Sequence, residues 1–360
     1  MNTVGHEFRI SLVGSSHGSI VGVVIDGVPP GKRIDENLIQ VELNRRRPGQ
    51  SSVTTDRVEK DKIIIEAGLF EGQSTGEPIV AYVRNKDIDS SYYDEIKDTP
   101  RPGHADYPAF VKYKGFNDIR GGGRFSGRLT LGIVIAGSIA KQLLQDMGIN
   151  FVAYSKSIGQ VNSDPDNLDL NTKLIYSDKN LVRTADAKAI QPMIQEITTA
   201  KENGDSVGGI VECVIQNLPV GVGEPWFDSV ESRLAHFIFS IPAVKGIEFG
   251  SGFKAAGMTG SSHNDEYEYL DDKVITKTNN AGGILGGLTN GMPVVFRVAF
   301  KPTSSIKKAQ QTVNLSSGEL NTLKMRGRHD PCIVPRAVPV VENAAACVLL
   351  DLMLQGKHID

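Results

Sequence analysis

The order of strand-like and helix-like segments limits the possible folds of this chain more than any other feature of the sequence. Residues 8–12 alternate apolar with polar side chains, and residues 20–25 follow as a second apolar run, so the pattern predicts two strands and a hairpin-like start. Farther along, helix-like and strand-like segments come in groups and do not alternate strictly. This grouping favours an α+β architecture over one built from repeated β-α-β units.

Apolar spacing and capping residues predict where the other elements lie. Helices are expected over residues 35–46, 133–147, 186–201 and 343–354, and another from Asp228 to a point before Pro242. Strands are expected over residues 207–215 and 294–300. Residues 343–354 are apolar almost all round, so we expect that helix to be buried, with Gly356 just past its end.

Composition and charge exclude several classes of protein. Lys and Arg number 39 against 42 Asp and Glu, a formal net charge of -3, which argues against a nonspecific nucleic-acid or membrane-surface binder. A hydrophobic share of 40% is typical of a soluble globular protein, and 360 residues allow one large domain or two, although no linker is evident. The longest apolar run, residues 131–140, is half of the ~20 residues that a membrane helix needs.

Cysteine usage and the N-terminal residues indicate the compartment. Cys213, Cys332 and Cys347 have no C-x-x-C spacing, so the sequence predicts neither a disulfide framework nor a zinc site. Glu7 and Arg9 stand where a secretory signal would have its apolar stretch. We therefore expect a cytoplasmic protein without a metal.

The segment from Gly14 to Gly18 satisfies the pattern G-x-S-x-G of the serine-hydrolase nucleophile elbow, with Ser16 as the nucleophile. An elbow lies between a strand and a helix, whereas here residues 20–25 resemble another strand. Two other interpretations are a tight loop that presents backbone N–H groups, hydroxyls and the imidazole of His17 to an anion, and an ordinary hairpin turn with an exposed histidine.

Arginine, histidine and glycine recur in polar loops, which is unusual in a chain of negative net charge. Each such loop has an ordinary explanation, for example cations that complement a helix C-terminus or a flexible turn. Together they favour a site for a ligand that is small, partly flat and multiply anionic. The loops are 45–50, 101–107, 120–128, 282–287, 301–305 and 326–331.

In this order, the segments resemble the chorismate synthase family. The matching segments are 16–18, 45–49, 70–72 with 75–76, 101–107, 121–124, 204–206, 281–287, 301–305, 327–332 and 336–339. The resemblance implies a single α+β domain over residues 1–360, a β-α-β sandwich that assembles as a homotetramer.

The resemblance also implies an activity. Members of the family are lyases of the shikimate pathway and of aromatic amino-acid biosynthesis, which convert 5-enolpyruvylshikimate 3-phosphate to chorismate and phosphate by an anti-1,4 elimination. They require reduced FMN, although the reaction is redox-neutral overall. The chain shows no reductase-like domain, so a separate flavin reductase is expected to supply the cofactor, with NADPH as a possible upstream reductant.

The family's site residues carry over by position. His17 resembles a general acid near the leaving phosphate, His104 a residue that protonates or holds the reduced flavin, and Asp330 a carboxylate that relays the ring proton. Flavin contacts are implied for Arg124, Ser126, Ala243, Gly286, Lys301, Pro302, Thr303, Ser304, Ser305 and Arg328, and a nicotinamide-nucleotide position for Arg46. Substrate contacts are implied for Ser16, Arg101, Arg128 and Arg328.

The sequence departs from the commoner family pattern at Ser15, Ser52, Phe125, Gly127 and Leu129. The residue at position 52 puts nucleotide binding by the chain itself in doubt, because many members carry an arginine there. Two other functions stay open: a serine hydrolase that uses Ser16, and an anion-binding protein without catalytic activity.

Overall fold

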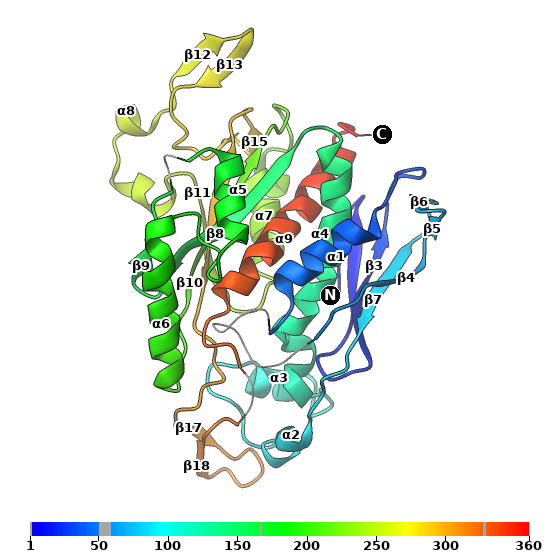
Figure 1. Cartoon of the computed structure of the whole chain (residues 1–360), viewed down its shortest axis with the longest axis vertical. Helices are drawn as coiled ribbons and strands as arrows, with labels where there is room; N and C mark the ends of the chain where they lie inside the picture. Colours follow the sequence, from blue (N-terminus) through cyan, green and yellow to red (C-terminus); the bar gives the residue numbers. More distant parts are fainter. Residues whose placement is uncertain (1, 50–58, 166–167, 327–328, 360) are drawn as a thin grey trace.

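The computed structural model describes residues 2–49, 59–165, 168–326 and 329–359. Within this part of the chain, three long helices lie between two five-stranded antiparallel sheets (Figure 1). The predicted α+β class is therefore confirmed. The helices are α1 (Glu36–Arg46), α4 (Thr130–Gln145) and α9 (Val334–Gln355).

The first sheet contains the N-terminal strands in the order β1-β2-β3-β7-β4. The predicted hairpin is confirmed, because β2 and β3 pair from Arg9 opposite Asp26 to Gly14 opposite Val21. The strands are β1 (Thr3–Val4), β2 (Arg9–Gly14), β3 (Ile20–Asp26), β4 (Ile64–Ala67) and β7 (Ile79–Arg84).

The second sheet has the order β11-β16-β10-β8-β9. Alternate residues of β16 from Val294 to Phe300 are buried, as its period-two pattern predicts, while Arg297 lies on the other face and pairs with Glu212 and Glu248. The strands are β8 (Asn150–Ile158), β9 (Val161–Asn162), β10 (Gly209–Gln216), β11 (Val244–Phe249) and β16 (Val294–Phe300).

The core helices pack between the two sheets. Helix α4 packs on β3 and on α9, and α9 packs on β8 and β10, so one hydrophobic cluster runs through the middle of the molecule. The buried C-terminal helix is confirmed and begins nine residues earlier than expected, at Val334. At the N-terminus of α1, the carboxylate of Asp35 accepts a hydrogen bond from the backbone N–H of Asn37, as the cap predicts.

Shorter elements surround this sandwich. Helices α5 and α6 pack on β8 (green in Figure 1), and α7 packs on α9 and β11. The expected cap at Asp228 is wrong, because the Ser229 hydroxyl accepts from the N–H of Ser232 and the helix begins at Val230. These helices are α2 (Ser91–Glu95), α3 (Asp106–Lys112), α5 (Leu170–Asp178), α6 (Ile190–Glu202), α7 (Val230–Ile238) and α8 (Gly260–His263).

Four two-stranded hairpins complete the described elements, and β12–β13 projects from the top of the molecule in Figure 1. Their strands are β5 (Leu69–Phe70), β6 (Gln73–Ser74), β12 (Tyr267–Leu270), β13 (Lys273–Thr276), β14 (Ile284–Leu285), β15 (Leu288–Thr289), β17 (Gln310–Val313) and β18 (Leu320–Leu323). Short 3-10 segments are η1 (Arg120–Phe125), η2 (Gly127–Leu129), η3 (Ala187–Ala189), η4 (Trp226–Asp228) and η5 (Gly252–Gly257).

In the described part of the chain, two helical stretches are long and apolar enough to cross a membrane by length and composition. They are Gly127–Gln145 and Val334–Gln355, and 83% and 94% of their apolar windows are buried inside the structure. The core helix of a soluble protein passes the same test, so the finding is weak evidence for a membrane protein.

Candidate active site

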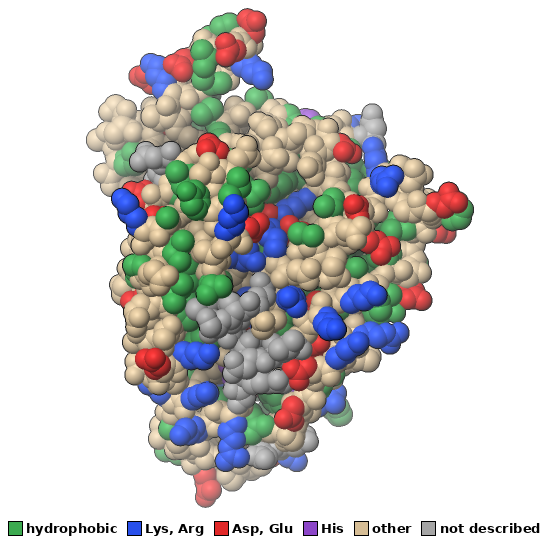
Figure 2. Space-filling model, viewed as in Figure 1, with side chains coloured by type: hydrophobic (Ala, Val, Ile, Leu, Met, Phe, Trp, Pro, Cys, Tyr) green, Lys and Arg blue, Asp and Glu red, His purple; other side chains and the backbone are tan. Residues whose placement is uncertain are grey.

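A cavity of about 930 Å³ opens where the N-terminal ends of α4 and α9 meet loops from both sheets. Seven Arg and Lys side chains line its described part, against three Asp and three His side chains, so its wall is electropositive. They are Arg46, Arg101, Arg124, Arg128, Lys301, Arg326, Arg336, Asp87, Asp89, Asp330, His17, His104 and His329. On the face in Figure 2, Lys and Arg side chains are interspersed with acidic ones, in keeping with a net charge near zero.

His17 lies against the glycine-rich loop. A β-carbon at Gly121 would be 2.3 Å from Cδ2 of His17 and 2.7 Å from Oγ of Ser16, and Gly121 has a φ of 60°. On its other side, the imidazole Nδ1 lies 2.8 Å from the hydroxyl of Ser90, and the ring meets Tyr93 edge-on at 5.3 Å. Only glycine fits this position, because of the close approach of the imidazole and the positive φ.

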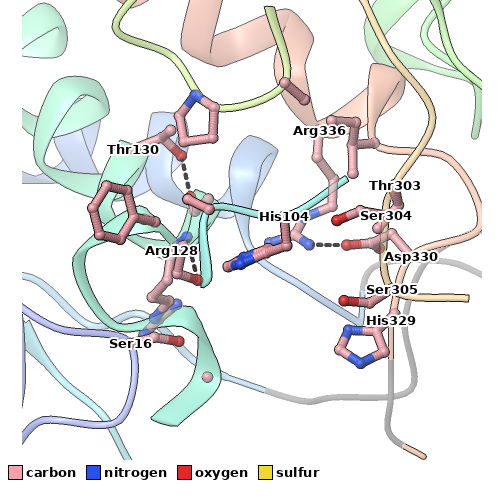
Figure 3. Close-up of a pocket in the computed structure, with 18 of the residues that line it drawn as sticks. Ser16, His104, Arg128, Thr130, Thr303, Ser304, Ser305, His329, Asp330 and Arg336 are labelled. Atoms are coloured by element: carbon pink, nitrogen blue, oxygen red, sulfur yellow. Dashed lines mark hydrogen bonds and ion pairs between the residues drawn. The ribbon is translucent and has the colours of Figure 1, made fainter. Parts of the chain in front are cut away.

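His104 contacts the next glycine of the same loop. A β-carbon at Gly122 would be 3.2 Å from Nε2 of His104. The other ring nitrogen, Nδ1, lies 2.6 Å from Oδ1 of Asp106, which also accepts from Arg101. Adjacent glycines thus hold the two imidazoles that were predicted from positions 87 residues apart in the sequence, and His104 projects into the pocket in Figure 3.

Ser16 is buried at the turn between β2 and β3 and lines the cavity. The Asn85 side chain shapes this turn, since its amide donates to the carbonyls of Ser15, Ser16 and Gly18 at 3.2, 3.2 and 2.8 Å. Because Ser16 connects two antiparallel strands, it lacks the strand-to-helix setting of a nucleophile elbow. This arrangement favours the anion-loop interpretation over a serine hydrolase.

Arg46 and Arg128 come together on one buried carboxylate. Asp61 lies 2.7 Å from Nη1 of Arg128 and 3.8 Å from Nη1 of Arg46. Arg46 also donates to the Thr130 hydroxyl and to the Gly127 carbonyl, at 3.2 and 2.6 Å. Burial, with the charges of nearby arginines, lowers the pKa of Arg46 well below its ordinary value. The cations predicted to bind ligands are therefore held in place by the protein's own anion.

Asp330 and His329 lie beside each other at the start of α9. The Asp330 carboxylate accepts from Arg336, the ion pair drawn in Figure 3. The Nε2 atom of His329 is buried without a hydrogen-bond partner. Burial and the charge of Arg101 lower the pKa of His329 to about 4, so its imidazole is neutral at pH 7.

The segment that follows β16 lines the wall opposite Arg128 (Figure 3). Nζ of Lys301 donates to the Gly103 carbonyl at 2.6 Å, and burial together with the charge of Lys245 lowers the pKa of Lys301. The Thr303 hydroxyl is buried without a hydrogen-bond partner, and the Ser305 hydroxyl accepts from Arg101 at 3.4 Å. Pro302 and Ser304 also line the cavity.

The other predicted contacts lie at three further places on the wall. Ser126 precedes α4 and accepts from the N–H of Arg128 at 3.3 Å, while Arg124 is exposed at the cavity and bonds to the side chain of Asn2. Ala243 has a φ of 74°, a left-handed conformation that side chains rarely adopt, and its carbonyl accepts from the N–H of Lys301.

Two predicted contacts are not among the cavity's described residues. Gly286 lies in the turn between β14 and β15, away from the lining of the cavity. Arg328 and the departure at Ser52 lie outside the described residues.

The sequence prediction missed the carboxylates and amide that orient the cations and imidazoles. In the structure, Asp61 and Asn85 contact Arg128, and Asp106 contacts His104. The prediction also missed Arg336, which pairs with Asp330, and His329, which lines the cavity. The spacing of His104 and Asp106 was a usable signal, because side chains two apart in a turn can meet. For Asp61 and Asn85 no local signal exists, since their partner Arg128 is 67 and 43 residues away.

Comparison with known proteins gives one consistent result. The family model described as chorismate synthase matches residues 8–354. A chorismate synthase from Pyrococcus abyssi (strain GE5 / Orsay) is 52% identical over 350 residues, 97% of each chain. Another from Methanococcoides burtonii (strain DSM 6242 / NBRC 107633 / OCM 468 / ACE-M) is 50% identical over 358 residues, 99% of this chain and 97% of that protein.

A solved structure extends this result to three dimensions. The structure titled "Crystal Structure of Chorismate Synthase" superposes with a TM-score of 0.78 at 28% identity and covers 98% of this chain and 93% of that chain. Sequence and fold agree over nearly the whole length, and the chain belongs to the chorismate synthase family.

Proposed function

We propose that this chain converts 5-enolpyruvylshikimate 3-phosphate into chorismate and inorganic phosphate, with reduced FMN as cofactor. Membership of the family supports chorismate formation in the shikimate pathway. The observation that carries the proposal is the meeting of His17 and His104 at adjacent glycines, inside a cavity with a large excess of cations.

In this proposal the cavity holds the flavin and the phosphorylated substrate together. Its volume of about 930 Å³ is near the upper end of the range for pockets that hold one small molecule, roughly 300–1,000 Å³. Two buried polar atoms, Oγ1 of Thr303 and Nε2 of His329, lack partners within the described chain and would be satisfied by polar ligand atoms. Arg and Lys side chains suit phosphate groups.

The apolar part of the lining suits a flat ring. Phe125, Phe239 and the segment 241–244 contribute hydrophobic side chains to the same cavity. A flavin held against this surface by Lys301, the hydroxyls of 303–305 and Ala243 would supply electron density for the departure of an allylic phosphate and take it back afterwards.

The residues of the chain have the following roles in the proposal. The substrate loses its phosphate and a ring proton, as the C–O bond to phosphate and a ring C–H bond break. Arg128 stabilises the negative charge on the departing phosphate, and His17 donates a proton to it as general acid. Ser90, at 2.8 Å from Nδ1, orients the His17 ring so that its Nε2 edge lies at Gly121.

On the cofactor side, His104 holds or protonates the reduced flavin through Nε2, because its Nδ1 is engaged by Asp106. Asp330 relays the ring proton, and Arg336 keeps its carboxylate at the cavity wall. Both assignments follow the family resemblance and use groups that line the same cavity.

The decisive experiment is anaerobic incubation with chemically reduced FMN and 5-enolpyruvylshikimate 3-phosphate, with phosphate and chorismate followed together. Stoichiometric release of both supports the proposal. Phosphate binding without turnover would instead identify an anion-binding protein, and hydrolysis of activated esters with labelling of Ser16 by a fluorophosphonate would identify a hydrolase.

The finer properties remain part of the proposal. We infer a homotetramer that acts in the cytoplasm and receives reduced FMN from a separate reductase with NADPH as the upstream electron donor. Arg46, the position associated with the nicotinamide nucleotide, is 3% exposed and bonded to Thr130 and Gly127. Its burial supports an external reductant over nucleotide binding by this chain.

A further inference from the structure

Asp106 makes contacts with two side chains that both line the cavity. Its Oδ1 lies 2.6 Å from Nδ1 of His104 and 2.8 Å from Nη2 of Arg101. Its Oδ2 accepts from Nε and from the backbone N–H of Arg101, at 2.7 and 3.0 Å. Burial alone would raise the pKa of Asp106, but hydrogen bonds from Arg101 and His104 hold it well below its usual range. The carboxylate is therefore ionised and can only accept.

The position of the hydrogen on His104 follows from these contacts. An ionised carboxylate has no hydrogen to give, so the short 2.6 Å contact requires one on Nδ1 of His104. The guanidinium of Arg101, 3.1 Å from the same Nδ1, has no acceptor atom and cannot take that hydrogen. Nε2 is then the free position of a neutral ring, or a second donor when the ring is protonated.

Arg101 fixes the carboxylate in turn. Its side chain is only 4% exposed, its guanidinium lies over the ring of Tyr93 at 5.7 Å, and that ring meets His17 edge-on. Two of its three guanidinium nitrogens, Nε and Nη2, donate to Asp106, and Nη1 donates to the Ser305 hydroxyl at 3.4 Å. Arg101 and Asp106 therefore hold one another in place beside His104.

We propose that Asp106 is a positioning residue that fixes the tautomer and the orientation of His104, so that Nε2, which lies beside Gly122, faces the ligand. The same arrangement of carboxylate, imidazole and reacting atom orients the histidine of serine proteases. The inference rests on the proposed function only for the identity of the ligand that Nε2 contacts. The tautomer itself is a property of the free protein.

The first test measures that tautomer in the whole chain. Ring ¹⁵N shifts of His104, assigned by loss of its signals in His104→Gln, are expected to show Nδ1–H at neutral pH in the wild type. In Asp106→Asn the Nδ1–H population falls, because the amide removes the negative charge that holds it. A wild-type ring with its hydrogen on Nε2 alone overturns the proposal, whether or not the protein makes chorismate.

The second test measures turnover with reduced FMN under anaerobic conditions. Asp106→Asn is expected to lower kcat roughly 100-fold with less than about a threefold change in the KM for the phosphorylated substrate, and Asp106→Glu to recover part of kcat. Asp178→Asn is the matched control, since Asp178, like Asp106, pairs with two cationic side chains, here Arg45 and Arg183, but lies outside the cavity lining. It keeps wild-type turnover.

The outcomes separate the two proposals. Wild-type turnover in Asp106→Asn overturns the positioning role and leaves the proposed function intact. A wild type that binds phosphate but never forms chorismate refutes the proposed function, while the ring ¹⁵N shifts still decide the role of Asp106. If Asp106→Asn does not fold, the proposal is tested by the ring ¹⁵N shifts of the wild type and by the kcat of Asp106→Glu. A kcat of Asp106→Glu as low as that of His104→Gln would count against the positioning role.

Discussion

The imidazole of His17 lies so close to Gly121 that a β-carbon there would be 2.3 Å from its Cδ2 and 2.5 Å from its Nε2. Gly121 also has a φ of 60°, where side chains are disfavoured. The backbone and the imidazole therefore define one another's positions at the edge of the cavity.

This contact predicts that Gly121→Ala inactivates the enzyme by displacing His17. We expect kcat to fall roughly 100-fold, because misplacement of a catalytic group by about 1 Å costs that much. Gly31→Ala is the matched control: its φ is 78°, but no atom lies within 4 Å of the added carbon. The check is an anaerobic activity assay of both variants, with circular dichroism to confirm folding. An equal loss of activity in Gly121→Ala and Gly31→Ala would contradict the prediction.

The two histidines give a second prediction. His17→Ala and His104→Ala are each expected to lower turnover about 10²–10⁴-fold, the usual contribution of a positioned acid or base. Both rings lie at the cavity, so the hydrophobic core is not disturbed and the unfolding midpoint in urea should change little. Near-normal rates with reduced FMN in either variant would refute the role assigned to that residue.

Asp61 gives a third prediction, on stability. Asp61→Asn keeps the shape of the side chain and tolerates the φ of 45°, but removes the negative charge that the buried guanidiniums of Arg46 and Arg128 share. Loss of one partner of a buried ion pair costs about 3–5 kcal/mol in the free energy of unfolding. Asp26→Asn, which breaks an exposed pair with Arg9, should cost about 0–1 kcal/mol. Equal urea midpoints for the two variants would show that the buried pair contributes nothing.

The pH dependence of stability gives a fourth prediction. The Glu42 side chain is 14% exposed, and although its partial burial would raise its pKa, the charges of Lys141 and Arg45 lower it from 4.5 to about 2. A carboxyl with a lowered pKa in the folded state stabilises fully above pH 4.5, and the stabilisation is lost as the pH falls toward 2. Its size is about 3 kcal/mol.

The check is urea unfolding of Glu42→Gln between pH 7 and pH 2. The variant should lose about 3 kcal/mol at pH 7 and approach the wild type at low pH. Glu36→Gln, on an exposed position of the same helix, should run parallel to the wild type. A Glu42→Gln curve that stays parallel to the wild type at all pH values would contradict the prediction.

Local patterns predicted the three core helices and four strands of the sandwich, β2, β3, β10 and β16, but not its other six strands. The hairpin at residues 9–26, the Asp35 cap and the buried C-terminal helix follow from side-chain periodicity and capping, which act over a few residues. Where two capping residues competed, at Asp228 and Ser229, the pattern alone chose the wrong one, because the backbone at Ser229 and not at Asp228 turned into the helix.

The candidate site was predictable in its cations, its imidazoles and the carboxylate of Asp330, but not in the side chains that hold Arg128. His17, His104 and Arg128 stand in glycine-rich motifs, whereas Asp61 and Asn85 stand in stretches with no motif and meet Arg128 only in space. The arginine run at 45–47 shows the same limit. Arg45 joins a buried network with Glu42 and Glu342, while Arg46 faces the cavity.

The sequence by itself determined the core helices, four strands of the two sheets and the chemical groups that the loops carry, because periodicity and composition are properties of neighbouring residues. Only the tertiary structure decided which carboxylate neutralises which arginine, and that Gly121 and Gly122 bring the imidazoles of His17 and His104 to one cavity. Ion pairing and close backbone approach depend on distances of a few ångströms between residues far apart in the chain, and only the packing of the two sheets on α4 and α9 sets those distances.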